Sequence, residues 1–152
     1  MPEDGNGNFF FANQKVRITP EGGIAIKLTN KSGANSTKGY LVHPSSTVDN
    51  AVDLVPLDEP DIIGVFYEDG IADGEEAWVV ISGIADVYYF GGSVREELAR
   101  MGQTADGGSA GEAISDVLPS PPFATDKHFQ EIGHVIENRV GNGLAKTVLH
   151  FN

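Results

Sequence analysis

The sequence has 152 residues, of which 40% are hydrophobic and 21% charged, a size that suits one domain with its own core. Its 19 Gly and 8 Pro argue against a helical bundle, and its net charge of −12 argues against general nucleic-acid binding, which relies on Lys and Arg. The sequence has no Cys, which excludes disulfides, thiolate metal ligands and a cysteine nucleophile.

Charge is distributed unevenly along the chain. Residues 39–94 contain 11 acids and no Lys or Arg, whereas residues 1–38 contain five basic residues and three acids. The first residues are polar and acidic, unlike a signal peptide, and the longest nearly apolar stretch, 77–90, is shorter than the roughly 20 residues that span a bilayer. We therefore expect a soluble, acidic protein with a slightly basic N-terminal segment and no membrane association.

Residues 1–20 show neither the period of a strand nor that of a helix over any length. We interpret them as an N-terminal arm that precedes a single β domain at 21–152, with a first strand of that domain as the alternative. The arm contains three adjacent aromatic residues, Phe9, Phe10 and Phe11. They have too little local sequence to cover them, so they are expected to pack against the domain, another subunit or another protein.

Short alternating apolar segments that end at turn residues predict strands in the first half of the domain. These segments are 16–18, 24–29, 40–43, 52–55 and 62–68. The breakers Pro44, Pro56 and Gly70 give each of the last three a physical reason to end, because Pro cannot donate a hydrogen bond to a sheet and Gly favours turns.

The strongest strand signal spans residues 77–90, with a pause at Gly83 that predicts a bulge or sharp bend. Apolar side chains occupy both alternating faces, so both faces should be covered, and the second cover could be another subunit. Trp78, Tyr88 and Phe90 add large apolar areas without catalytic partners. We interpret these aromatics as contact surface, with ordinary core packing as the alternative.

A helix is predicted at 93–102, with Ser93 as N-cap, Glu96 as its capping-box partner and Gly102 beyond the end. A long irregular connection follows, so that residues 93–122 or thereabouts form a helix and loop insertion.

The chain ends in a predicted hairpin, with strands at 132–139 and 144–151 joined by a Gly-Asn-Gly turn at 141–143. The sum is a mainly β protein, an antiparallel barrel or sandwich with an extended N-terminal arm, one short helix and a long loop.

The residues that could carry chemistry are sparse. Four histidines occur, His43, His128, His134 and His150, and none of them is spaced as in a helical zinc motif. His134 and His150 lie on the two strands of the predicted hairpin and could be neighbours, which structural packing explains equally well. We therefore expect no catalytic residue, no metal and no cofactor.

Other chemical motifs are incomplete. The acidic segment 69–76 lacks the ligand rhythm of a calcium loop, so a solvated turn is preferred over weak cation binding. The glycine-rich segments 91–93 and 107–111 lack the Lys and Ser or Thr of a phosphate-binding loop.

Several short motifs occur in a distinctive order, at 62–66, 74–87, 128–137 and in the closing Leu-His-Phe-Asn at 149–152. In this order they resemble the capsid cement, or head-decoration, proteins of tailed bacteriophages, over about residues 39–152. Members of that family continue in strand-like fashion after the position of Phe90, whereas this chain has the helix-like segment and long loop. The first twenty residues lie outside the resemblance.

The resemblance implies a β-barrel-like structural protein of the virion, made in the host cytoplasm and bound to the outer surface of an icosahedral capsid. Such proteins are commonly homotrimers that clamp capsomers of the major capsid protein. The resemblance implies no enzymatic activity and no cofactor. We expect the arm to hold the capsid, with Lys15 and Arg17 pairing with acids of a neighbouring subunit or of the major capsid protein.

Two other classes of function stay open at this point. A β-barrel module for a small ligand or carbohydrate would use Trp78 and Tyr88 for stacking. An enzyme would use His43, or the pair His134 and His150.

Overall fold

The computed structural model describes residues 14–151, and these form a single mixed sheet with very little helix. The strands are β1 (Val16–Ile18), β2 (Gly23–Asn30), β3 (Leu41–Pro44), β4 (Ala51–Leu54), β5 (Gly64–Phe66), β6 (Glu76–Tyr89), β7 (Leu98–Met101), β8 (Ala113–Asp116), β9 (Glu131–Val135) and β10 (Gly143–Leu149). The helices are the 3₁₀ turn η1 (Thr104–Asp106) and α1 (Thr125–Gln130). The predicted mainly β fold is confirmed.

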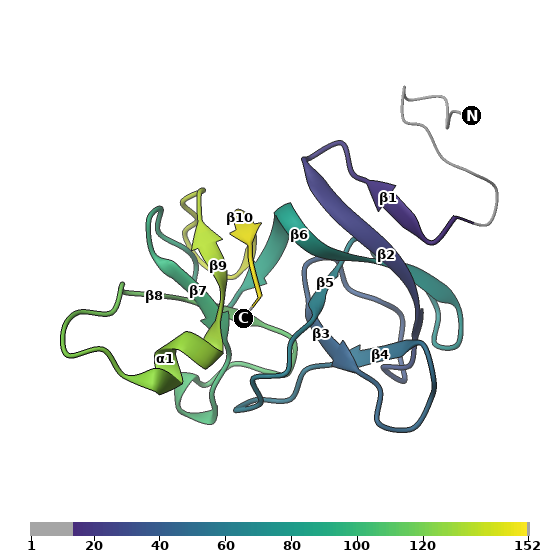
Figure 1. Ribbon diagram of the computed structural model, residues 1–152, viewed down its shortest axis with the longest axis horizontal. Coiled ribbons are helices and arrows are strands. Elements are labelled where there is room, and N and C mark those ends of the chain that lie inside the picture. The colour runs from purple at the N-terminus through teal and green to yellow at the C-terminus, as the bar shows by residue number, and fades with distance from the viewer. Residues whose placement is uncertain (1–13, 152) are drawn as a thin grey trace.

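The sheet is organised around β6, the longest of these strands. Its order is β1-β2-β4-β3-β5-β6-β10-β9-β7-β8, and β6 also pairs with β2 and touches β8. Most neighbours are antiparallel, but β2 with β4 and β6 with β8 are parallel. Figure 1 shows β6 in the middle of the molecule, with β1–β5 on one side of it and β7–β10 on the other.

Buried apolar residues form two cores, both of which include residues of β6. The larger core contains Ala25, Leu41, Val55, Ile62, Val65, Val80, Ala85, Val87, Tyr89, Ala99, Met101, Ala113, Ile132, Val135, Ala145 and Leu149. The smaller core contains Val42, Val52, Phe66, Ala77 and Val79. The first half of β6 is therefore covered on both faces by its own chain. The sequence pattern had also allowed another subunit as the second cover.

The residues of β6 change face just before Gly83. Val80 and Ala85 both join the larger core although they are five positions apart, and strict alternation would place them on opposite faces. The register against β2 shifts between Ile24 and Ala25, which leaves Ile81 of β6 out of the alternation. The bulge therefore lies two residues before the predicted Gly83, which pairs with Gly23 and has φ +79°.

The helix predicted at 93–102 is wrong. Its second half forms β7, all four residues of which are buried between β8 and β9. Ser93 forms a bridge with Arg139 rather than an N-cap, and Glu96 has φ +75°, which ends any helix. The pairing of β7 on both of its edges and the burial of its side chains outweigh the local helix signals, which amount to about 0.5 kcal/mol per residue or less.

The segment after β7 is also more ordered than predicted, because β8 returns antiparallel to β7 and completes a second hairpin. The terminal hairpin is confirmed, with Val135 opposite Thr147, although seven residues separate its strands. Helix α1 was not predicted, because six residues are too few for a helical period to appear.

Arg100 is a charged residue inside the fold, only 6% exposed. Its guanidinium donates two hydrogen bonds of 2.9 Å to Asp106 and one of 2.7 Å to Asp116. The bonds from Arg100 hold the pKa of Asp106 below its usual value and outweigh the opposing effect of burial. This network ties β7 to β8 and η1.

No helix among residues 14–151 is long and apolar enough to cross a membrane.

Candidate functional site

The N-terminal end of the sheet gathers three of the residues that the sequence singled out. Nζ of Lys15 lies 2.7 Å from a carboxylate oxygen of Glu76, to which it donates a hydrogen bond within an ion pair. The guanidinium of Arg17 lies 5.8 Å from the ring centre of Trp78, and the Lys27 ammonium lies 5.2 Å from the same ring. Cations of the chain itself thus lie over Trp78, a geometry that does not favour stacking of a sugar on this ring.

The other candidate residues lie elsewhere. Tyr88 is at the opposite end of β6, where its ring centre is 5.1 Å from that of Tyr40. Phe90 follows β6, is half-buried, and packs against the backbone of Gly108. Phe9, Phe10 and Phe11 lie outside the described residues. The structure therefore brings Lys15, Arg17 and Trp78 together but separates Tyr88 and Phe90 from them.

A row of outward-facing aliphatic residues crosses four strands of the sheet, and the sequence analysis did not identify it. Ile18 of β1 lies opposite Ile24 of β2, and Ile84 of β6 lies opposite Val148 of β10. Ile24 lies opposite Ser82, two residues from Ile84 on the same face. Ile18, Ile24 and Val148 are 69%, 43% and 38% exposed. We call Ile18, Ile24, Ile84 and Val148 the apolar row.

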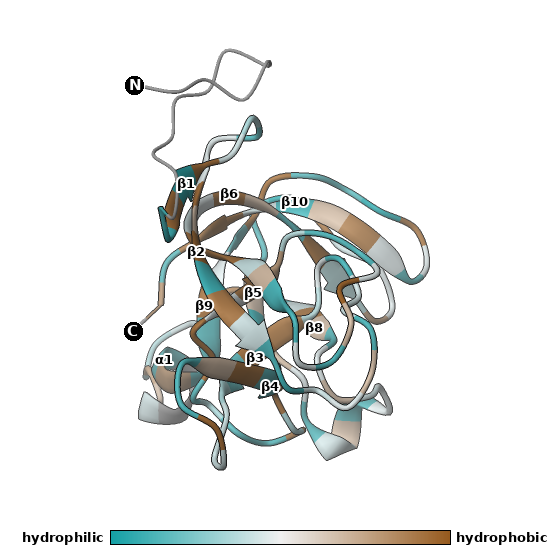
Figure 2. Ribbon diagram, turned by 90° about the vertical axis from the view of Figure 1, so that its right-hand side faces the viewer, coloured by the Kyte–Doolittle hydropathy of each residue, from teal (hydrophilic) through white to brown (hydrophobic). Residues whose placement is uncertain are grey.

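The apolar row begins at β1, which is the edge strand on its side of the sheet formed by residues 14–151. Figure 2 shows hydrophobic residues along β1 and β6. An exposed edge strand offers unpaired backbone groups, and exposed aliphatic side chains favour contact with another protein. Alternation of Ile with polar residues could have revealed one apolar face of β1 and β2, but not that this face is exposed.

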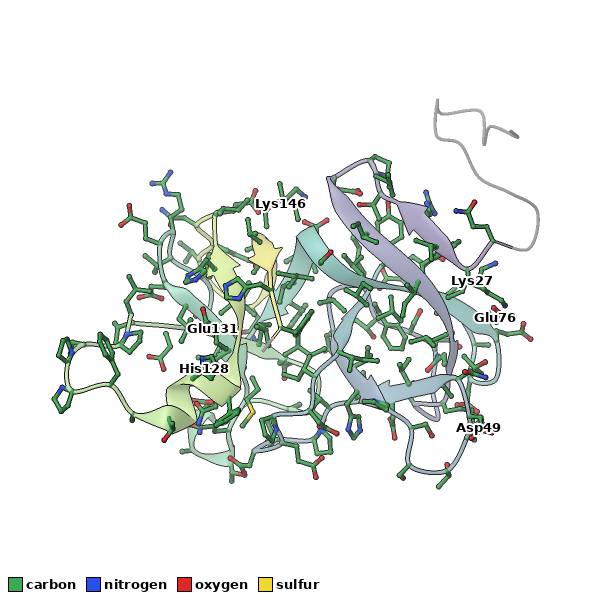
Figure 3. The ribbon with its side chains drawn as sticks, viewed as in Figure 1. Lys27, Asp49, Glu76, His128, Glu131 and Lys146 are labelled. Carbon is green, nitrogen blue, oxygen red and sulfur yellow. The ribbon has the colours of Figure 1, made fainter. Side chains whose placement is uncertain are left out.

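At the far end of the apolar row lies a cluster of one carboxylate and two imidazoles. Oε1 of Glu131 is 3.0 Å from Nε2 of His134 and 3.3 Å from Nε2 of His150. The two imidazole ring centres are 5.0 Å apart, which confirms the expected proximity of these histidines. His134 lies opposite Val148, the last residue of the row. Figure 3 labels Glu131 at the start of β9.

The other two histidines have different surroundings. Nδ1 of His43 is 2.9 Å from a carboxylate oxygen of Asp61 and 3.9 Å from one of Glu59. His128 lies in α1, where its ring packs edge-on against Phe129 with 5.4 Å between centres. Neither arrangement pairs two imidazoles.

The acidic segment 69–76 connects β5 to β6, as the predicted turn requires. Its carboxylates are engaged by the chain itself: Asp69 accepts from the backbone N–H of Lys38, and Asp73 accepts from Lys31. These bonds are typical of a turn stabilised by its own basic neighbours.

Asp86 on β6 is a second focus of charge on the outer face. Its carboxylate lies 2.6 Å from Nζ of Lys146 and 3.4 Å from Nζ of Lys38. Burial opposes its ionisation, but the bond from Lys146 and the two ammonium charges outweigh that effect and lower its pKa.

This lowered pKa predicts a pH dependence of stability. A carboxyl whose pKa is lower in the folded state stabilises the fold above its unfolded value of about 4, and this contribution is lost as the pH falls through the folded pKa. Asp86→Asn should therefore lower the free energy of unfolding at pH 7 but make little difference at pH 2, as measured by urea denaturation. Asp49→Asn, at an exposed site that Figure 3 labels, is the control and should change neither value. An equal loss for Asp86→Asn at both pH values would contradict this assignment.

These features define a β-rich protein whose most prominent surface is apolar and bordered by charge. Searches of known protein families and of curated proteins find no match to this sequence. Among solved structures, the fold is similar to the N base of head fiber gp8.5 of bacteriophage phi29, with a TM-score of 0.52 and 14% identity, over 83% of this chain and 92% of that chain. At this level of identity the likeness establishes a shared fold.

Proposed function

We propose that the chain is a structural protein of a bacteriophage virion that binds the outer surface of the head as a homotrimer and stabilises contacts between capsomers of the major capsid protein. The observation that carries the proposal is the fold shared with a protein of a phage head. The order of short motifs at 62–87 and 128–152 supports the same class of function independently. The proposal includes no enzymatic activity and no direct contact with nucleic acid.

The surface features suggest how such a protein could act. The apolar row offers aliphatic area whose burial between subunits would favour a trimer. The N-terminal arm, with Phe9, Phe10 and Phe11, is then available for the capsid, and many copies on one lattice would add avidity to a modest contact. Lys15 and Arg17 belong to the predicted arm at 1–20, but Arg17 lies in β1 of the sheet and Lys15 just before it. We propose that these two residues and Trp78 extend the capsid contact. Tyr88 and Phe90 would contribute to a contact at the opposite end of β6.

The arm can be tested without disturbing the sheet, because β1 begins at Val16. Removal of residues 1–13 should abolish co-sedimentation with undecorated capsids of the phage that encodes the chain. The truncated protein should still have the mass of three of its own, shorter chains in light scattering coupled to size exclusion, just as the full chain should have three times 16.2 kDa. Undiminished capsid binding by the truncated protein would contradict the assigned role of the arm.

The trimer contact has its own variant in the same experiment. Ile24→Ser places a polar group in the apolar row and should reduce the mass in solution to that of one chain. Val48→Ser changes an aliphatic residue of similar exposure outside the row and should leave the mass unchanged. A trimer that persists in Ile24→Ser at low protein concentration would exclude the row as the subunit contact.

A further inference from the structure

We propose that Glu131, His134 and His150 form a binding site for one divalent transition-metal ion of the zinc class. The three ligand atoms all lie within 4.8 Å of one another, and each side chain can supply one of them. The proposal concerns a property of the folded chain and does not depend on the virion function proposed above.

The distances in the cluster suit a small ion. Zinc binds imidazole nitrogen and carboxylate oxygen at about 2.0–2.2 Å in tetrahedral geometry, so two of its ligand atoms lie about 3.3 Å apart. The oxygen of Glu131 lies 3.0 Å from the nitrogen of His134 and 3.3 Å from that of His150. An ion could therefore bind with only small side-chain movements, replacing the direct contacts between these groups.

The backbone places the three side chains on one face in a way that alternation alone does not. Glu131 and His134 are three residues apart, and in a regular strand such residues point to opposite faces. The register of β9 against β7 shifts between Glu131 and Gly133, where Ile132 turns into the larger core. This irregularity brings Glu131 to the face of His134. His150 directly follows β10 and joins them there. Its backbone N–H donates a hydrogen bond to the carbonyl oxygen of Ile132.

The chemistry of the ligands selects the ion. Two imidazoles and one carboxylate match zinc, nickel or copper, whereas calcium and magnesium prefer sites built from oxygen alone. Three protein ligands leave one tetrahedral position open to water or to a group from a partner. The side chains of His134 and His150 are 46% and 45% exposed, so the cluster is accessible from outside.

The cluster at His43 provides an internal comparison. It joins a single imidazole to the carboxylates of Glu59 and Asp61, both of which are more than half exposed. Exposed carboxylates are well hydrated and bind transition metals weakly without further nitrogen ligands. The structure thus favours the cluster with two histidines and makes His43 the appropriate control.

The test is zinc binding by the full-length chain, produced without a histidine tag and freed of metal with a chelator. Isothermal titration with zinc chloride at pH 7.5 should show one ion per chain. Cobalt should give the visible absorption of a tetrahedral complex. His134→Asn and His150→Asn should each weaken binding at least tenfold, and the double variant should bind no zinc in the range measured; Glu131→Gln should weaken binding about tenfold. His43→Asn and His128→Asn should bind zinc like the original chain.

The proposal is overturned by an original chain that binds no zinc, or by a His134/His150 double variant that binds it unchanged. Loss of binding in His43→Asn alone would do the same, by moving the site to the other cluster. If the double variant fails to fold, the imidazole NMR signals of the original chain decide the question. Zinc must then shift the signals of His134 and His150, and an effect confined to His43 and His128 would contradict the site.

Discussion

Replacing Gly83 with Ala is expected to lower the free energy of unfolding by about 3 kcal/mol, because two separate penalties act at this position. Gly83 has φ +79°, a conformation that is strained for residues with a Cβ atom. An added Cβ would also lie 2.4 Å from the carbonyl oxygen of Gly22 and 3.1 Å from Cα of Gly23. Both contacts are backbone, so no side chain can move aside to relieve them. Urea denaturation measures the loss.

Gly70→Ala separates the two penalties. Gly70 has φ +83°, almost the same as Gly83, but an added Cβ there would meet nothing within 4 Å. Its replacement should therefore cost only the conformational strain, about 1 kcal/mol. Equal losses for the two variants would show that close approach of β2 and β6 at Gly83 contributes nothing.

Arg100→Met is expected to cost a similar amount, about 3 kcal/mol, for an electrostatic reason. Met fills much of the same volume but removes the guanidinium that donates two hydrogen bonds to the largely buried carboxylate of Asp106. Removing one partner of a buried ion pair is costly chiefly because the other charge stays behind. Unfolding in urea, followed by circular dichroism, gives the change in free energy.

The same reasoning sets the controls for Arg100. Arg95→Met changes an exposed Arg near β7 and should alter stability by less than about 0.5 kcal/mol. Adding Asp106→Asn to Arg100→Met removes the negative charge that Arg100 had compensated and should recover part of the loss. A free energy of unfolding for Arg100→Met that lies within about 1 kcal/mol of the original value would contradict a structural role for this network.

The strands of the first half and the terminal hairpin could be predicted from sequence because their signals are local. Segments such as 52–55 combine apolar residues with a terminating Pro, and the structure places a strand at each of them. The order of the strands could not be predicted in this way. The parallel neighbours β2 and β4 are a property of the whole fold, and nothing in either segment encodes its partner.

The region around β7 shows why local signals fail. Residues 96–101 contain good helix formers, and Ser93 and Glu96 have the spacing of a capping box. That pattern involves only one turn of chain. The structure instead buries Leu98 and Met101 of β7 between the hairpin partner β8 and the more distant strand β9. A pattern of a few residues carries no information on that burial, because the burial depends on strands that lie outside the pattern.

The candidate sites divide along the same line. The proximity of His134 and His150 follows from a hairpin, which a turn motif identifies. Glu131 could not be added to them, because only the irregularity in β9 turns it to the same face. Gly133 was the available signal, since a glycine within a strand often accompanies such an irregularity. The apolar row was missed because its isoleucines are indistinguishable by sequence from core residues.

The placement of β6 makes the molecule a single cooperative unit. Ala77 and Val79 belong to the smaller core, whereas Val80 and Val87 belong to the larger one, so one continuous strand is an inseparable part of both. Opening of either half is therefore expected to disturb the packing of the other. Mechanical load applied at one end of the sheet would therefore be shared between the two cores through β6.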